Sequence, residues 1–277
     1  MTLLDGSLLF LTAGTASELA ALPGIARLAA ATNNQLVIVH LVGGDDARGD
    51  DRRIAAAVAG LAAEPPVAVL TVLAANLPAA LATFRATNSR LLALEPSRRG
   101  GLLRVLLGNT DEQLLRLHAT PLLALPASGA LAPIRRLLFP LDFAPRSDAA
   151  FEATLDLCRV LGAELYLLHV YGEDVLLPAE QDTTQRSGAK TVRDLLAIDQ
   201  EQLQRYHERA AARDLPVRVA TAEGRAHVAI NAYAAANAID LVVMATHGPR
   251  TLEDILLGTS TARTIRGAGV PVLAIPA

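Results

Sequence analysis

Short aliphatic runs alternate with longer stretches of helical periodicity along the whole chain. In the C-terminal half, five runs rich in Leu, Val, Ile and Ala predict strands at residues 135–141, 164–170, 217–221, 239–245 and 270–275. Between these runs, the apolar spacing predicts a helix ending at Gly162 and helices at residues 191–213, 226–237 and 259–266. Strands that alternate with helices favour a parallel sheet covered on both faces, which is a doubly wound α/β fold.

The chain also repeats itself. Residues 8–41 align with residues 137–170 without gaps, with 8 of 34 positions identical, and residues 90–127 align with residues 240–277 with 11 of 38 identical. The offset grows from 129 to 150, so the second copy carries 21 extra residues in its middle. They fall within residues 172–200, a polar segment.

The repeat predicts two domains in tandem. The seam at residues 127–133 contains small residues, a glycine and a proline, which mark a linker. We therefore expect domains at residues 1–128 and 133–277, each a five-stranded, Rossmann-like parallel sheet.

The last strand of each copy is expected at a sheet edge. Residues 270–275 contain Pro271, and Pro276 follows, and proline cannot donate to a strand ladder. Because an exposed aliphatic edge favours pairing, this strand should pair with residues 122–125 of the first copy. The two domains would then be related by a pseudo-twofold axis.

Composition excludes several classes of partner. The chain is 52% hydrophobic, only 3% aromatic, and has a net charge of −3. It therefore has neither the excess of basic residues nor the aromatic side chains for base stacking that nucleic-acid binding would favour. No apolar run reaches the ~18 residues of a membrane helix, and the N-terminus lacks the basic segment of a signal peptide. We expect a soluble cytoplasmic protein with no membrane contact. Cys158 lies in an apolar helical pattern and is expected to be a core residue.

One segment has the composition of a phosphate site. Residues 244–260 lie between a predicted strand and a predicted helix and include Gly248 and Gly258. Glycine lets an anion approach the backbone, and the first N–H groups of a helix lack internal partners. Thr259, the expected N-cap, and Ser260 add hydroxyl donors. Two loop glycines alone are more often simple turn residues.

This segment resembles the nucleotide-binding signature of the universal stress protein family, Gly-x2-Gly-x9-Gly-[Ser/Thr]. It reads Ala245-x2-Gly248-x9-Gly258-Thr259 here. The segment Phe139–Phe143 is similar to the first-strand signature of that family, and Leu167–Val170 resembles its second. The three matches occur in the expected order, and the repeat extends the resemblance over nearly the whole chain.

The resemblance implies a site for an adenine nucleotide, ATP, with or without Mg²⁺, in the second domain. It places Asp142, followed by Phe143, near the ribose and the backbone of Val170 at the adenine edge. It places the phosphates among Gly248, Gly258, Thr259 and Ser260. Ala245 stands where ATP-binding members of the family have their first glycine. Because alanine adds only a methyl group, weaker binding is expected rather than none.

Several candidate residues also have a structural interpretation. Asp142 is suited to cap the end of its strand. His40 and His169 occupy matching strand ends and are interpreted as structural, since no second ligand lies at a metal-binding spacing. Glu253 and Asp254 could hold Mg²⁺, but neighbouring helical residues point apart, which favours a solvated face.

The first copy has lost the signature. Its aligned positions are Glu95, Arg98, Gly108 and Asn109, and Ala13 stands opposite Asp142. Because Glu95 would repel a phosphate and Arg98 would fill the space kept open by Gly248, we expect no ATP binding there. A structural or regulatory role is predicted for this domain.

Three functions remain open from the sequence. The first is a nucleotide-binding stress-response regulator or sensor that acts through a protein partner. The second is a scaffold in which nucleotide binding is vestigial. The third is an enzyme, for which the sequence offers no catalytic residues and no P-loop, nucleophile elbow or paired metal ligands. Slow ATP hydrolysis or autophosphorylation stays compatible with the first, as does a homodimer of tandem chains.

Overall fold

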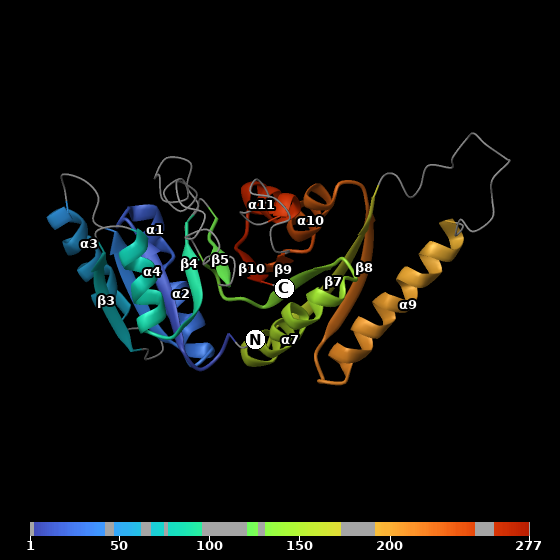
Figure 1. The fold of residues 1–277 in the computed structure, drawn as a ribbon, viewed down its shortest axis with the longest axis horizontal. Helices are drawn as coiled ribbons and strands as arrows, with labels where there is room; N and C mark the ends of the chain where they lie inside the picture. Colours follow the sequence, from blue (N-terminus) through green and yellow to red (C-terminus); the bar gives the residue numbers. More distant parts are fainter. Residues whose placement is uncertain are drawn as a thin grey trace.

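The computed structural model of the chain contains one ten-stranded sheet with helices on both faces (Figure 1). The structure describes residues 3–41, 47–61, 68–74, 77–95, 121–126, 131–172, 192–246 and 258–276. The first half contributes the strands β1 (Ser7–Thr12), β2 (Gln35–Leu41), β3 (Val69–Ala74), β4 (Ser89–Leu94) and β5 (Leu122–Ala124). Its described helices are α1 (Ala16–Ala20), α2 (Leu22–Ala31), α3 (Ala47–Gly60) and α4 (Leu77–Ala86).

The second half contributes the strands β6 (Arg136–Leu141), β7 (Glu164–Tyr171), β8 (Val217–Glu223), β9 (Leu241–Thr246) and β10 (Val272–Pro276). Its helical elements are the 3-10 turn η2 (Pro145–Ser147), α7 (Asp148–Leu161), α9 (Val192–Ala211), α10 (Ala226–Ala236) and α11 (Gly258–Gly267). All five predicted strands are confirmed, with ends shifted by up to two residues. The predicted N-cap role of Thr259 is wrong, because α11 already begins at Gly258.

The strand order shows why the repeat produces one sheet. It runs β3-β2-β1-β4-β5-β10-β9-β6-β7-β8, so each half has the same order, read outward from the centre. Strands within a half are parallel, whereas β5 and β10 pair antiparallel. Leu123 lies directly opposite Leu273, its equivalent in the repeat, which places a pseudo-twofold axis between them. The predicted pairing of the two last strands is therefore confirmed.

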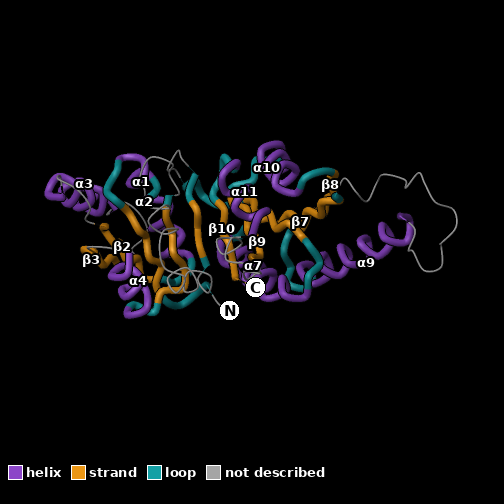
Figure 2. Tube along the Cα trace, turned by 45° about the horizontal axis from the view of Figure 1, so that its top comes forward, coloured by secondary structure: helices purple, strands orange, loops and turns teal. Residues whose placement is uncertain are grey.

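The core follows the alternation of side chains along the strands. On one face, a single cluster of buried residues runs through both halves and includes side chains of α2, α3, α7 and α9. On the opposite face, the two halves have separate clusters, one under α4 and one under α10 and α11. Figure 2 shows α9 extending from the sheet at one end of the molecule. The continuous face joins the halves into one packed unit.

The described part of the connection between the halves is packed tightly on α2. A Cβ atom at Gly24 would lie 2.1 Å from the carbonyl oxygen of Leu131, so only glycine permits this approach. Arg27 donates from Nη2 to the same carbonyl oxygen at 3.1 Å. Residues 127–130 of the predicted linker lie outside the described residues.

Candidate functional site at the carboxyl ends of β6, β7 and β9

The second half has its topological switch point at β6. The chain passes from β6 to β7 on one side, while β9 pairs with β6 on the other. In open parallel sheets, ligands bind beyond the carboxyl ends of the strands at such a point. Asp142 follows β6, Val170 lies near the end of β7, and Ala245 and Thr246 end β9, so the fold brings these residues to one edge.

Asp142 and Phe143 form a tight turn after β6. Asp142 is exposed, and its Oδ1 accepts hydrogen bonds from the backbone N–H of Ala144 at 3.0 Å and from Oγ of Ser147 at 2.7 Å. Phe143 adopts a left-handed conformation with φ of 55°, which is uncommon for a bulky side chain. Asp142 therefore caps the turn, the structural role that the sequence allowed.

His169 supports this turn from β7. Its Nδ1 lies 2.9 Å from the carbonyl oxygen of Leu141 and donates to it, and its ring stacks on Phe143 with centroids 4.3 Å apart. Its Nε2 lies 3.4 Å from Oδ2 of Asp199 on α9. His169 thus connects β6, the Asp142–Phe143 turn and α9, in agreement with a structural role.

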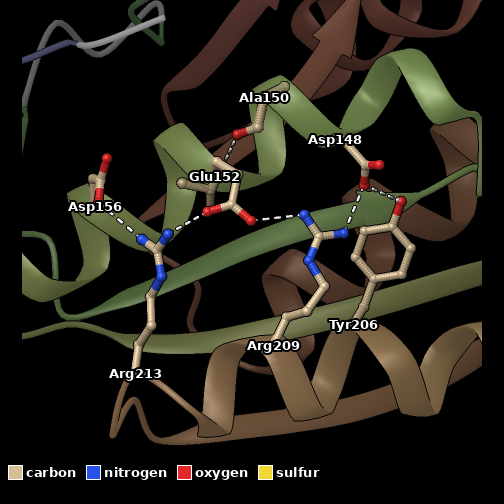
Figure 3. A network of polar contacts seen from close by, with 8 residues as sticks. Asp148, Ala150, Glu152, Asp156, Tyr206, Arg209 and Arg213 are labelled. Atoms are coloured by element: carbon tan, nitrogen blue, oxygen red, sulfur yellow. Dashed lines mark hydrogen bonds and ion pairs between the residues drawn. The ribbon is translucent and has the colours of Figure 1, made fainter.

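A row of ion pairs holds α9 against α7 (Figure 3). Arg209 donates to Asp148 at 2.6 Å and to Glu152 at 2.7 Å, and Arg213 donates to Glu152 and, at 2.9 Å, to Asp156. Because the acids are spaced by four residues on α7 and the arginines by four on α9, the two rows face each other.

Tyr206 extends this row toward the turn. Its hydroxyl donates to Asp148 at 3.0 Å, and burial together with this acceptor raises the pKa of Tyr206 to about 12. The Arg209 hydrogen bond lowers the pKa of Asp148. Tyr206 also packs edge-on against Phe151, with centroids 4.7 Å apart, so α9 is fixed by rings as well as by charges.

The remaining candidate residues lie on β7, β9 and α11. The side chain of Val170 packs against the cluster under α10, and that of Ala245 packs against the core of the other face. Gly258 and Thr259 lie in the first turn of α11, and Ser260 is exposed. A crossover helix runs back antiparallel to the strands it connects, so α11 begins at the same edge as Asp142. Gly248, Glu253 and Asp254 lie outside the described residues.

The corresponding edge of the first half contains two buried acids. Glu18, on α1, accepts from Oγ1 of Thr12 and the backbone N–H of Ala13, both at 3.0 Å, and from the N–H of Thr15 at 3.1 Å. Glu95 is only 5% exposed and accepts from Oγ of Ser17 at 2.8 Å. Burial raises the pKa of Glu95, and the negative charge of Glu18 adds to this effect.

Glu18 is a residue that the sequence interpretation missed. It aligns with Ser147, yet its carboxylate accepts hydrogen bonds from the turn after β1, as Asp142 does in the turn after β6. The missed signal is the capping box Thr15-x-x-Glu18 at the start of α1, in which both reciprocal bonds are present.

The two histidines at matching strand ends both lie near an acid of the next described helix. Each faces this acid through a different ring nitrogen: Nδ1 of His40 lies 2.8 Å from Oδ1 of Asp51 on α3, whereas His169 meets Asp199 on α9 through Nε2. In the part of the chain that the structure describes, no three His, Cys, Asp or Glu side chains are grouped to hold a metal ion.

Cys158 is fully buried, and burial raises the pKa of its thiol to about 12, which confirms its prediction as a core residue. No helix of the described residues is both long and apolar enough to span a bilayer.

The fold and this edge define a tandem, doubly wound α/β protein of the Rossmann-like type. Comparison with family models matches residues 133–276 to the universal stress protein family. The chain is 28% identical over 272 residues to a universal stress protein of Mycobacterium tuberculosis, covering 88% of each chain. A universal stress protein of Archaeoglobus fulgidus shares its fold at a TM-score of 0.60 and 17% identity, covering 99% of this chain and 97% of that one. A similar protein of Pseudomonas aeruginosa gives 0.66 at 15% identity, with coverage of 98% and 92%. The chain belongs to the universal stress protein family.

Proposed function

We propose that the second half binds an adenine nucleotide, ATP, with or without Mg²⁺, at the edge formed by β6, β7 and β9. The protein would act in the cytoplasm as a stress-response regulator through a protein partner, not as an enzyme. The observation that carries the proposal is that Asp142, Val170 and the start of α11 meet at one switch point in a member of this family. The domains 1–128 and 133–277 and the roles of individual residues belong to this proposal.

Each part of the edge suits one part of the nucleotide. The exposed carboxylate of Asp142 can accept from ribose hydroxyls. Val170 lies one residue beyond His169, the last β7 residue paired with β6, so its carbonyl oxygen lies past the paired stretch and is available on that side for the adenine edge. At the start of α11, Gly258, Thr259 and Ser260 offer N–H groups and the positive end of the helix dipole to phosphates, as Gly248 would from the preceding loop.

The alanine at position 245 is compatible with this arrangement. Its side chain packs against the core cluster on the α7 face, where it contributes to the core. Alanine at this position nevertheless also favours the alternative of a scaffold without nucleotide, so the test must separate the two.

The first half is proposed not to bind ATP. Glu18 already accepts the donors of the turn after β1, and the buried Glu95 stands at the position of Ala245. Two carboxylates at this edge would repel phosphates.

The test is calorimetric titration of ATP into nucleotide-free protein, after identification of any nucleotide released on denaturation. We expect about one ATP per chain and loss of binding in Gly258→Val, because a branched side chain would block the phosphate approach. Gly269→Val is the matched control, since a Cβ atom there meets nothing within 4 Å. No binding by the wild type would favour the scaffold, and unchanged affinity in Gly258→Val would exclude the assigned phosphate site.

A further inference from the structure

The two edge strands of the sheet differ in their protection against pairing. β3 has only β2 as a strand neighbour, and β8 has only β7, among the described residues. β8 carries Arg218 and Glu223, and Arg218 forms an ion pair with Glu164 at 2.5 Å and lies over Tyr166. Charged side chains of this kind discourage edge pairing. β3, with the sequence Val-Leu-Thr-Val-Leu-Ala, contains neither a charge nor a proline.

The β3 edge is also apolar and accessible. Leu70 is 40% exposed and Leu73 59% exposed, and they are two of the four exposed large hydrophobic residues of the described chain. The helices α3 and α4 flank β3 at this end of the molecule (Figure 1). Their exposed residues include several alanines: Ala55, Ala56, Ala59, Ala82 and Ala86. Both helices also carry charged residues, with Asp51, Arg52 and Arg53 exposed on α3 and Arg85 exposed on α4. The apolar surface at this edge therefore belongs to β3 itself and to these alanines.

The backbone of β3 points alternately toward β2 and toward the open edge. The N–H of Leu36 donates to the carbonyl oxygen of Ala68 at 2.8 Å, and Leu36 is in register with Val69. In a parallel ladder, alternate residues serve one neighbour. Leu70 and Val72 therefore bond to β2, whereas the N–H and C=O groups of the residues between them face the edge: Val69, Thr71 and Leu73.

We propose that β3 pairs antiparallel with β3 of a second copy of this chain, about a twofold axis at Thr71. Thr71 would then lie opposite its equivalent, and Val69 opposite Leu73 of the partner, with about six hydrogen bonds between the edge-facing groups. On one face of the sheet, Val69 of the second copy would cover Leu73. On the other face, Val72 of the second copy would cover Leu70. The ten strands of each copy would form one continuous sheet.

The β3 edge is better suited to pair with β3 of a second copy than with β8, the other edge strand of the sheet. Pairing β3 with itself opposes no like charges, whereas pairing it with β8 would lay the charged side chains of Arg218 and Glu223 along a strand that offers them no charged partner. The molecule already contains the same kind of joint, since Leu123 and Leu273 meet across the antiparallel pair β5–β10. Because a single strand pair is a small interface, we expect dissociation in the micromolar range.

Sedimentation velocity over a range of protein concentrations tests the proposal without nucleotide. We expect the wild type to dimerise, and Leu73→Lys and Thr71→Pro to remain monomeric. The proline would remove only an edge-facing N–H, so the bonds of β3 to β2 would remain. Val219→Lys, the same kind of change on β8, is the matched control and should still dimerise. A monomeric wild type, or dimers that persist in both β3 variants, would overturn the proposal.

Cross-linking tests the register. Thr71→Cys should give a covalent dimer with a short thiol–thiol reagent, because bonded cross-strand residues have Cα atoms about 5.5 Å apart. Cys158 will not interfere, since it is buried and its thiol pKa is raised to about 12. Val219→Cys should give no dimer. Cross-linking through Val219 and not through Thr71 would assign the contact to β8 and refute the β3 pairing.

Discussion

At the residue scale, the turn after the first strand of each half is held by a carboxylate from a different position. In the second half, Asp142 comes from the turn itself and is exposed. In the first half, Glu18 comes from the following helix and is buried. In both halves a backbone N–H of the turn donates to a carboxylate, but the carboxylate lies at the surface in one half and in the interior in the other. This exchange shows that the two repeats hold the same turn with acids from different positions.

Glu95 provides the prediction at this scale. Its folded-state pKa is raised by burial, so the stability that its protonated form contributes is present below its ordinary pKa and is lost as pH rises through the folded-state value. At neutral pH, Glu95→Gln should therefore stabilise the protein, because it removes a charge that burial disfavours. The gain should vanish near pH 4. Urea unfolding at both pH values measures it.

The control for this variant is Glu223→Gln, at an exposed position of β8. It should change stability little at either pH. A Glu95→Gln variant that is less stable than the wild type at neutral pH would show that the buried charge is favourably compensated.

At the element scale, single backbone positions decide where helices end. Gly162 follows α7 with φ of 62°, and the N–H of Ala163 donates to the carbonyl oxygen of Cys158 at 2.9 Å. Helices commonly end at a glycine in the left-handed conformation, because in other residues the Cβ atom would crowd the neighbouring backbone carbonyl oxygen there. The turn then directs the chain into β7 and so places His169 and Val170.

Gly162→Ala should destabilise the protein by about 1 kcal/mol, purely through backbone strain. A Cβ atom at Gly162 meets nothing within 4 Å, so no clash contributes. Gly60→Ala at the end of α3 is the matched control, because it is equally open but has no positive φ, and it should be neutral or slightly stabilising. Thermal unfolding of both variants gives the comparison. An equal loss in the two would contradict the strain argument.

At the scale of the whole molecule, two features join the halves. The pair β5–β10 continues the sheet across the pseudo-twofold axis, and the connecting segment at Leu131 packs on α2. Because the core on one face also runs through both halves, unfolding one half would expose apolar residues of the other. We therefore expect the halves to unfold together.

Gly24→Ala tests this packing. The added methyl group would overlap the backbone of Leu131, which cannot move as a flexible side chain would, so a loss of about 2 kcal/mol or more is expected. Gly172→Ala, where a Cβ atom meets nothing within 4 Å, should have little effect. Urea unfolding followed by probes in each half should give coincident transitions for the wild type. Separate transitions would show that the two halves are independent.

The sequence by itself determined the local and repeating features of this protein. The aliphatic runs gave the five strands of the second half to within two residues, and the repeat with its proline-flanked last strands gave the central β5–β10 pair. These features depend on periodicity and on the missing N–H of proline, which a sequence displays directly. Asp142 was placed at its strand end for the same reason.

Tertiary structure decided the contacts between residues distant in the chain. The pairs His169–Asp199 and His40–Asp51, and the close approach of Gly24 to Leu131, depend on where elements meet in space. The unequal protection of β3 and β8 likewise required the strand order. A sequence fixes which residues can cap, pair or pack, whereas the packing of distant elements decides which of them do so.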